Sequence, residues 1–192
     1  MNARWLVGLS AGLILTACVQ MPQTREEFRA AVAKGAFSTK AESLAVNKNF
    51  KQAVTNLSAK TDACLNKVVE CFMMKGMYQE RSRSTYRASV QTPAANRAEF
   101  TMQVMHNPRG VGADPPPGGF YLMVADIEAA SPNSFRVNLY RPTLGHGDTV
   151  DAVRNWLNGK GDACPKLPWS RSGRSAARRI SDFCNFVSPS RA

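Results

Sequence analysis

Residues 49–65 read NFKQAVTNLSAKTDACL, and they form the clearest helical pattern in this chain of 192 residues. The mostly apolar side chains recur at helical spacing, which places them on one face. These side chains are Phe50, Ala53, Val54, Leu57, Thr61, Cys64 and Leu65. Asn49 is a favoured N-cap residue. The pattern therefore predicts a helix over 50–65 whose apolar face packs against a β-sheet.

Apolar segments on both sides of this helix predict the strands of that sheet, because most of them alternate with polar residues. The segments are 39–46, 68–74, 86–90, 100–104, 120–127 and 135–139. Residues 131–133, Ser-Pro-Asn, favour a turn that joins the last two strands as a hairpin. Residues 107–119 are rich in glycine and proline, which predicts a long exposed loop.

Two further helices are expected. A Thr-Arg-Glu-Glu sequence resembles a capping box and predicts a short helix over 25–34. A second helix is expected over 150–158, where Asp148 or Thr149 is in position to cap it. Val150, Val153 and Leu157 would form its apolar stripe, with Trp156 at the edge.

Together these elements predict an α+β fold, a two-layer arrangement in which an antiparallel sheet of five to six strands is packed by two helices. The expected domain covers 39–159, after a tether and short helix in 18–38 and before a basic tail in 160–192. The order of elements across 39–158 resembles that of helix-grip domains in bacterial envelope lipoproteins, including those of the outer-membrane β-barrel assembly machinery. This resemblance lies in element order, so it implies no site residue.

The first residues have the layout of a secretory signal. Arg4 precedes an apolar run over 5–15 that is too short to span a bilayer as a mature helix. The sequence Leu15-Thr16-Ala17-Cys18 resembles the lipobox of bacterial lipoproteins. This resemblance implies removal of residues 1–17 as a signal peptide and acylation of the Cys18 thiol. An ordinary signal peptide or an uncleaved N-terminal anchor is the alternative.

The residue that follows Cys18 is Val19 and not aspartate. In the usual enteric sorting rule for such lipoproteins, this implies transport to the outer membrane. The protein is then expected on the periplasmic face, where its partners would be the membrane that holds the lipid and another envelope protein.

Four further cysteines are present, namely Cys64, Cys71, Cys164 and Cys184. An even number in an oxidising compartment predicts two disulfides, and without a close C-x-x-C pair a metal site is not expected. We favour Cys64 with Cys164 and Cys71 with Cys184, because helix ends on one sheet face can meet. The local alternative pairs Cys64 with Cys71 and Cys164 with Cys184.

The chain is basic, with 25 Lys and Arg residues against 14 Asp and Glu. Such an excess attracts anionic lipids and acidic proteins, whereas nucleic acid is not an expected partner of an exported protein. The segment 160–192 is especially basic, and it is expected to dock on the core through one turn of helix that carries Ile180, Phe183 and Phe186. Its expected contacts with an anionic surface are Arg171, Arg174, Arg178 and Arg179. A tail whose charge serves no binding is the alternative.

No catalytic set or cofactor motif is evident. His146 and Asp148 are close in sequence, but their place at a helix start indicates a loop and a cap. Several methionines invite a copper(I) site, yet most lie in strand patterns where methionine fills core gaps. We therefore expect a non-enzymatic accessory or assembly lipoprotein that binds another protein, without metal or cofactor. The alternative is a carrier of a lipid-like ligand in a helix-grip cavity.

Overall fold

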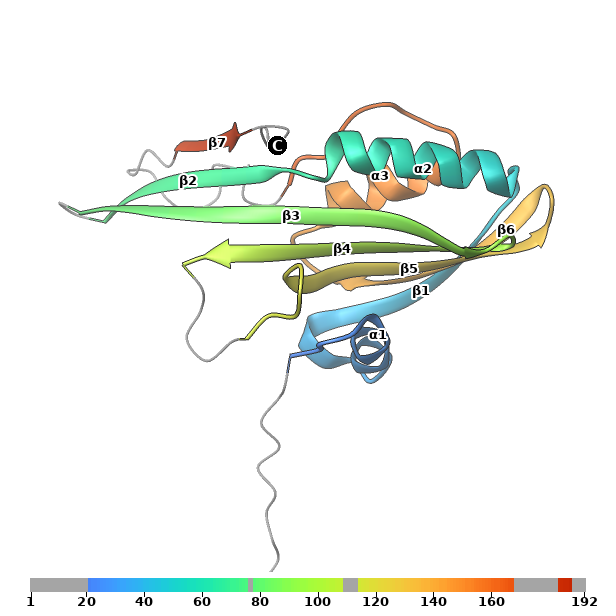
Figure 1. Cartoon of the computed structure of the whole chain (residues 1–192), viewed down its shortest axis with the longest axis horizontal. Coiled ribbons are helices and arrows are strands. Elements are labelled where there is room, and N and C mark those ends of the chain that lie inside the picture. The colour runs from blue at the N-terminus through green and yellow to red at the C-terminus, as the bar shows by residue number, and fades with distance from the viewer. Residues whose placement is uncertain (1–20, 76–77, 109–113, 168–182, 188–192) are drawn as a thin grey trace, which may run out of the picture.

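A seven-stranded antiparallel sheet forms the centre of the computed structural model, which describes residues 21–75, 78–108, 114–167 and 183–187 (Figure 1). The strand order is β1-β6-β5-β4-β3-β2-β7, so consecutive strands from β2 to β6 are neighbours. The bounds are β1 Thr39–Val46, β2 Val68–Lys75, β3 Tyr78–Ala94, β4 Arg97–Asn107, β5 Phe120–Ser131, β6 Ser134–Pro142 and β7 Phe183–Val187.

Helices pack on both faces of this sheet (Figure 1). Helices α2 (Phe50–Cys64) and α3 (Gly147–Leu157) lie side by side on one face, which we call the core face. Helix α1 (Arg25–Ala33) and the single turn η1 (Ala36–Ser38) lie on the other face near β1, β5 and β6. We call this second face the open face. The predicted α+β fold is confirmed, and α1 adds a partial third layer.

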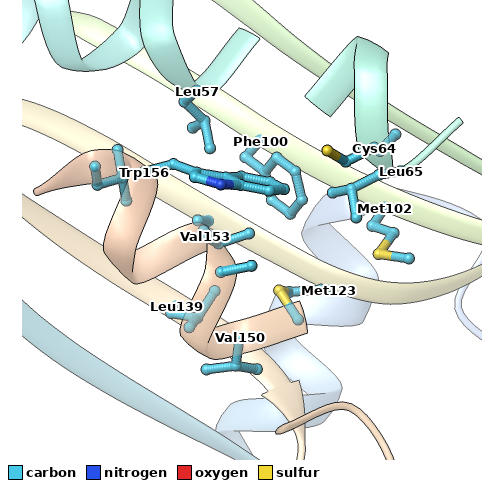
Figure 2. Close-up of a cluster of buried hydrophobic side chains, with 14 of the residues drawn as sticks. Leu57, Cys64, Leu65, Phe100, Met102, Met123, Leu139, Val150, Val153 and Trp156 are labelled. Atoms are coloured by element: carbon cyan, nitrogen blue, oxygen red, sulfur yellow. The ribbon is translucent and has the colours of Figure 1, made fainter. Parts of the chain in front are cut away.

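The core lies between the sheet and the helix pair α2 and α3 (Figure 2). Phe100 and Met102 of β4 are fully buried, and they point to the same side because alternate residues of a strand share a face. Trp156, which the sequence places at the edge of the apolar stripe of α3, packs among them and is 1% exposed. Because α3 lies beside α2, the face of α3 that carries Trp156 is also covered, and Trp156 belongs to the same core cluster as the buried residues of α2. Leu167, beyond the expected domain end, joins the same core.

The caps of the first two helices follow the sequence prediction. The Thr24 side chain accepts a hydrogen bond from the Glu27 backbone N–H at 3.1 Å, and Asn49 accepts one from Gln52 N–H at 3.0 Å. The cap of α3 differs, because His146 occupies the N-cap position and Asp148 and Thr149 lie inside the helix. The prediction that one of those two residues caps α3 was therefore wrong by two or three positions.

The C-terminal element also differs from its prediction. Residues Phe183–Val187 form strand β7, and not a helical turn, because they extend the sheet along the outer edge of β2. That edge offers unpaired backbone donors and acceptors, which an extended segment satisfies and a helical turn cannot. The register places Cys184 opposite Cys71.

Candidate interaction surface

Helix α1 is held to the open face by a buried cluster of polar contacts around Arg25. The Nη1 atom of Arg25 lies 2.7 Å from Oδ1 of Asp126 and 3.4 Å from Oε2 of Glu99. Nη2 donates to the carbonyl oxygen of Ala125 at 2.6 Å, and Nε donates to Oγ1 of Thr101 at 3.3 Å. Arg25 is 9% exposed and Asp126 is 3% exposed. Buried charges are tolerated when they are paired and hydrogen-bonded in this way. These contacts therefore fix the position of α1 on the open face.

Apolar contacts also stabilise α1 in this position on the sheet. Phe28 and Val32 of α1 are buried against Val124 of β5. The Phe28 ring also stacks on the Tyr121 ring, with centroids 5.8 Å apart. Phe28 and Val32 lie on one face of α1, because residues four positions apart in a helix share a face. The sheet face that receives them follows from the alternation of β5, in which Val124 points away from the core while its neighbours Met123 and Ala125 point into it.

Exposed arginines occupy much of the remaining open face. Arg81, Arg83 and Arg87 alternate with inward-facing residues along β3, and Arg136 lies on β6. Arg81 lies 2.6 Å from Glu70 of β2, yet the Glu70 side chain is 12% exposed against 61% for Arg81. The acidic group is therefore recessed and the guanidinium groups stand outward. Such a surface can bind carboxylates or phosphates.

Strand β1 forms one edge of the sheet. Within the residues that the structure describes, no strand pairs with its outer edge. Pro142, which has no N–H, is opposite Thr39, and the Thr143 N–H donates to the Ser38 carbonyl oxygen at 2.9 Å. Because hydrogen-bonded pairs alternate in an antiparallel ladder, Lys40 and every second residue after it bond to β6. Ala41, Ser43 and Ala45 consequently direct their backbone N–H and C=O groups outward.

The structure also joins a serine and a histidine that the sequence analysis did not connect. Ser84 of β3 is opposite His106 of β4, and Oγ of Ser84 lies 3.0 Å from Nδ1 of His106. Burial lowers the pKa of His106, which favours the neutral ring. A serine hydroxyl beside a neutral imidazole is the start of a nucleophilic site. Ser84 is, however, only 5% exposed, so a substrate carbonyl cannot reach its oxygen in this conformation.

The other histidine has a structural position. His146 is the N-cap residue of α3, and burial lowers its pKa. Asp148 lies in the first turn of the same helix, where a negative charge favours the positive end of the helix dipole. Among the described residues, no group of three or more His, Cys, Asp or Glu side chains could hold a metal ion. Met102 and Met123 are fully buried, in line with the interpretation that strand methionines fill the core.

Cys64 and Cys164 form the long-range disulfide that the sequence analysis favoured. Cys64 at the end of α2 is joined to Cys164, 100 residues later, with their Cα atoms 5.1 Å apart. Cys71 is also disulfide-bonded, and Cys184 is its cross-strand neighbour. The lipidation candidate Cys18 lies outside the described residues. The four tail arginines predicted to contact an anionic surface, Arg171, Arg174, Arg178 and Arg179, lie outside them as well.

Two surface grooves lie at the ends of the helices. One of about 360 Å³ runs along α2 and the segment after α3, between Gln52 and Gly161. The other, of about 530 Å³, lies where Phe50 meets Asn96 and Pro132. A helix-grip carrier would hold its ligand between the helices and the sheet, and buried side chains such as Trp156 occupy that space (Figure 2).

No helix within the described residues combines the length and the apolar character needed to cross a membrane. No protein-family model, curated protein or solved structure matches this chain.

Proposed function

We propose that this protein is a bacterial envelope lipoprotein that binds another envelope protein and has no catalytic role. Its acylated Cys18 would attach it to the periplasmic face of the outer membrane. The lipobox-like sequence Leu15-Thr16-Ala17-Cys18 supports the attachment. The Cys64–Cys164 disulfide supports an oxidising compartment, because such bonds persist outside the reducing cytosol.

The open edge of β1 is the observation that carries the binding role. It offers eight residues in an uninterrupted register with β6, without a bulge or a proline inside the strand. The side chains beside the outward backbone groups are small, and they belong to Ala41, Ser43 and Ala45. Proteins usually protect such an edge with charges, bulges or prolines. An extended segment of a partner protein could add to this edge through main-chain hydrogen bonds.

Lipid attachment is tested with Cys18→Ala. We expect the wild-type protein to carry acyl chains on the peptide that begins at Cys18 and to fractionate with the outer membrane. The variant should lose the acyl mass and either keep residues 1–17 or leave the membrane fraction. A wild-type protein without acyl mass at Cys18 would contradict the lipoprotein assignment.

The β1 edge is tested by photo-crosslinking in intact cells, with a photoreactive residue in place of Ser43 on β1 or Thr55 on the exposed surface of α2. We expect a discrete crosslink from position 43, with the captured peptide identified by mass spectrometry, and none from position 55. The captured protein is then purified and its affinity measured against two variants. Ser43→Pro removes one outward N–H and should weaken binding, whereas Ser43→Thr keeps it and should not. Equal affinity of both variants would contradict binding at this edge.

A further inference from the structure

We propose that the open face of the sheet is turned toward the membrane, with its exposed arginines against anionic phospholipid headgroups. This inference rests on the proposed acylation of Cys18. It adds an orientation to the attachment, and it places α2 and α3 on the side away from the bilayer.

The short tether limits how far the domain can stand from its lipid. Cys18 is only three residues before Met21, the first residue that the structure describes. An extended chain spans at most about 3.5 Å per residue, so the Cα atoms of Cys18 and Met21 are no more than roughly 11 Å apart. If the acyl chains on Cys18 lie in the bilayer, the start of the described chain is close to the headgroups.

The first described residues are held on the open face by side-chain contacts. The Gln23 side chain donates from Nε2 to the carbonyl oxygen of Asp114 at 3.1 Å, and two residues later Arg25 enters its buried cluster on the sheet. Because α1 cannot leave the open face without unpairing Asp126, the described chain begins at Met21 on the side of the sheet that carries α1 (Figure 1). Packed layers are about 10 Å apart, so the axis of α2 is roughly 20 Å from that of α1 across the sheet, on the side away from Met21.

The charges of this face suit an anionic surface. Arg81, Arg83, Arg87 and Arg136 are all exposed on its strands. The exposed acidic residues on the same side are Glu26 and Glu27 of α1, Asp114, whose carbonyl oxygen binds Gln23, and Glu128 of β5. Lys34 at the end of α1 is a further exposed basic residue on this side. Basic residues are attracted to an anionic bilayer, and this attraction extends over a Debye length of about 10 Å. With Lys34, five exposed basic residues therefore stand against four exposed acidic residues, and this small excess orients a protein that its lipid already holds.

The orientation is tested with the acylated full-length protein in vesicles of phosphatidylethanolamine and phosphatidylglycerol. A fluorescent amino acid replaces Ser89 on the open face or Thr55 on α2, both of which are exposed. A nitroxide on the lipid headgroup then quenches whichever fluorophore lies near the membrane. We expect quenching to be several-fold stronger at position 89. Equal quenching, or stronger quenching at position 55, would overturn the orientation.

The arginine contact is tested in the same vesicles with a matched pair of variants. Arg87→Ser with Arg136→Ser should reduce quenching at position 89, and salt near 1 M should reduce it in the wild type, because screening shortens the range to about 3 Å. Lys48→Ser with Lys51→Ser, which removes two exposed charges near the start of α2, should leave it unchanged. Quenching that ignores both the arginine variant and salt would overturn the arginine contact.

Mass spectrometry of each vesicle sample distinguishes a failure of the proposed acylation from a failure of the proposed orientation. A protein without acyl chains at Cys18 would overturn the proposed function and this inference with it. A protein that is acylated but quenched equally at positions 89 and 55 would overturn the orientation alone.

Discussion

Arg25 and Asp126 are 101 residues apart in the sequence, and they form a buried ion pair in which Nη1 and Oδ1 lie 2.7 Å apart. The pair connects the first helix to strand β5. Asp126 has a second partner in Arg29, whose Nε lies 3.2 Å from Oδ2. The position of α1 therefore depends on charges that only the folded chain brings together.

Replacing Arg25 tests how much this ion pair contributes to the free energy of unfolding. Arg25→Met leaves the Asp126 carboxylate buried with one guanidinium fewer, and we expect a loss of about 3 kcal/mol in the free energy of unfolding. Hydrogen exchange of the α1 amides should rise more than that of the β4 amides. The double variant Arg25→Met with Asp126→Leu should recover part of the loss, because neither charge then remains buried alone. A single variant as stable as the wild type would contradict this role.

The Cys64–Cys164 disulfide should contribute strongly to stability, because it closes a loop of 100 residues. The chain-entropy model assigns such a loop about 4–5 kcal/mol. We expect Cys64→Ala with Cys164→Ala to lower the free energy of unfolding by about 4 kcal/mol, as measured by denaturant titration with tryptophan fluorescence. A loss below about 1 kcal/mol would show that the loop is already restricted in the unfolded chain.

The second disulfide should join Cys71 to Cys184. These residues are direct cross-strand neighbours in the register of β2 and β7, and Cys71 is disulfide-bonded. A non-reducing peptide map of the purified protein should therefore contain one peptide pair with Cys71 and Cys184. A map that joins Cys71 to Cys64, or Cys184 to Cys164, would contradict the arrangement.

Glu42 should make the protein less stable in acid. Burial alone would raise its pKa, but hydrogen bonds and charges from Arg141 and Arg154 outweigh burial and hold the pKa of Glu42 below its ordinary value of 4.5. A folded-state pKa below the unfolded value stabilises the protein at higher pH, and this contribution disappears as the pH falls through the folded value. Glu42→Gln should therefore lose about 1–3 kcal/mol at pH 7, and its deficit should shrink below pH 4.5. A deficit that is independent of pH would contradict the ion-pair explanation.

Two glycines with positive φ provide a matched test of close packing. A Cβ at Gly119 would lie 2.3 Å from the carbonyl oxygen of Val104, whereas a Cβ at Gly35 would meet nothing within 4 Å. Gly35→Ala should cost about 1 kcal/mol, which is the usual penalty for a side chain in the left-handed region. Gly119→Ala should cost at least about 2 kcal/mol more, since the backbone of β4 must move. Equal thermal unfolding of the two variants would contradict the close approach of this turn to β4.

The helices and most strands could be predicted from the sequence because their signals are local. Apolar spacing identified the buried face of α2, the residues around Asn49 and Thr24 identified its cap and that of α1, and alternation identified β4. Each of these signals depends on residues within a few positions of one another, so each can be recognised in the sequence without the tertiary structure.

The sites could not be predicted in the same way, because they depend on register and on the choice of sheet face. Nothing local indicates that Ser84 is opposite His106, that Arg25 reaches Asp126, or that α1 lies on the face away from α2. The residues of β7 became a strand because β2 offered an unpaired edge and a cysteine opposite Cys184. The local elements and their apolar faces follow from the order of the residues alone. Which faces meet, which edge stays open and where the charges gather depend on contacts between residues far apart in the chain, so these features arise only when the chain folds.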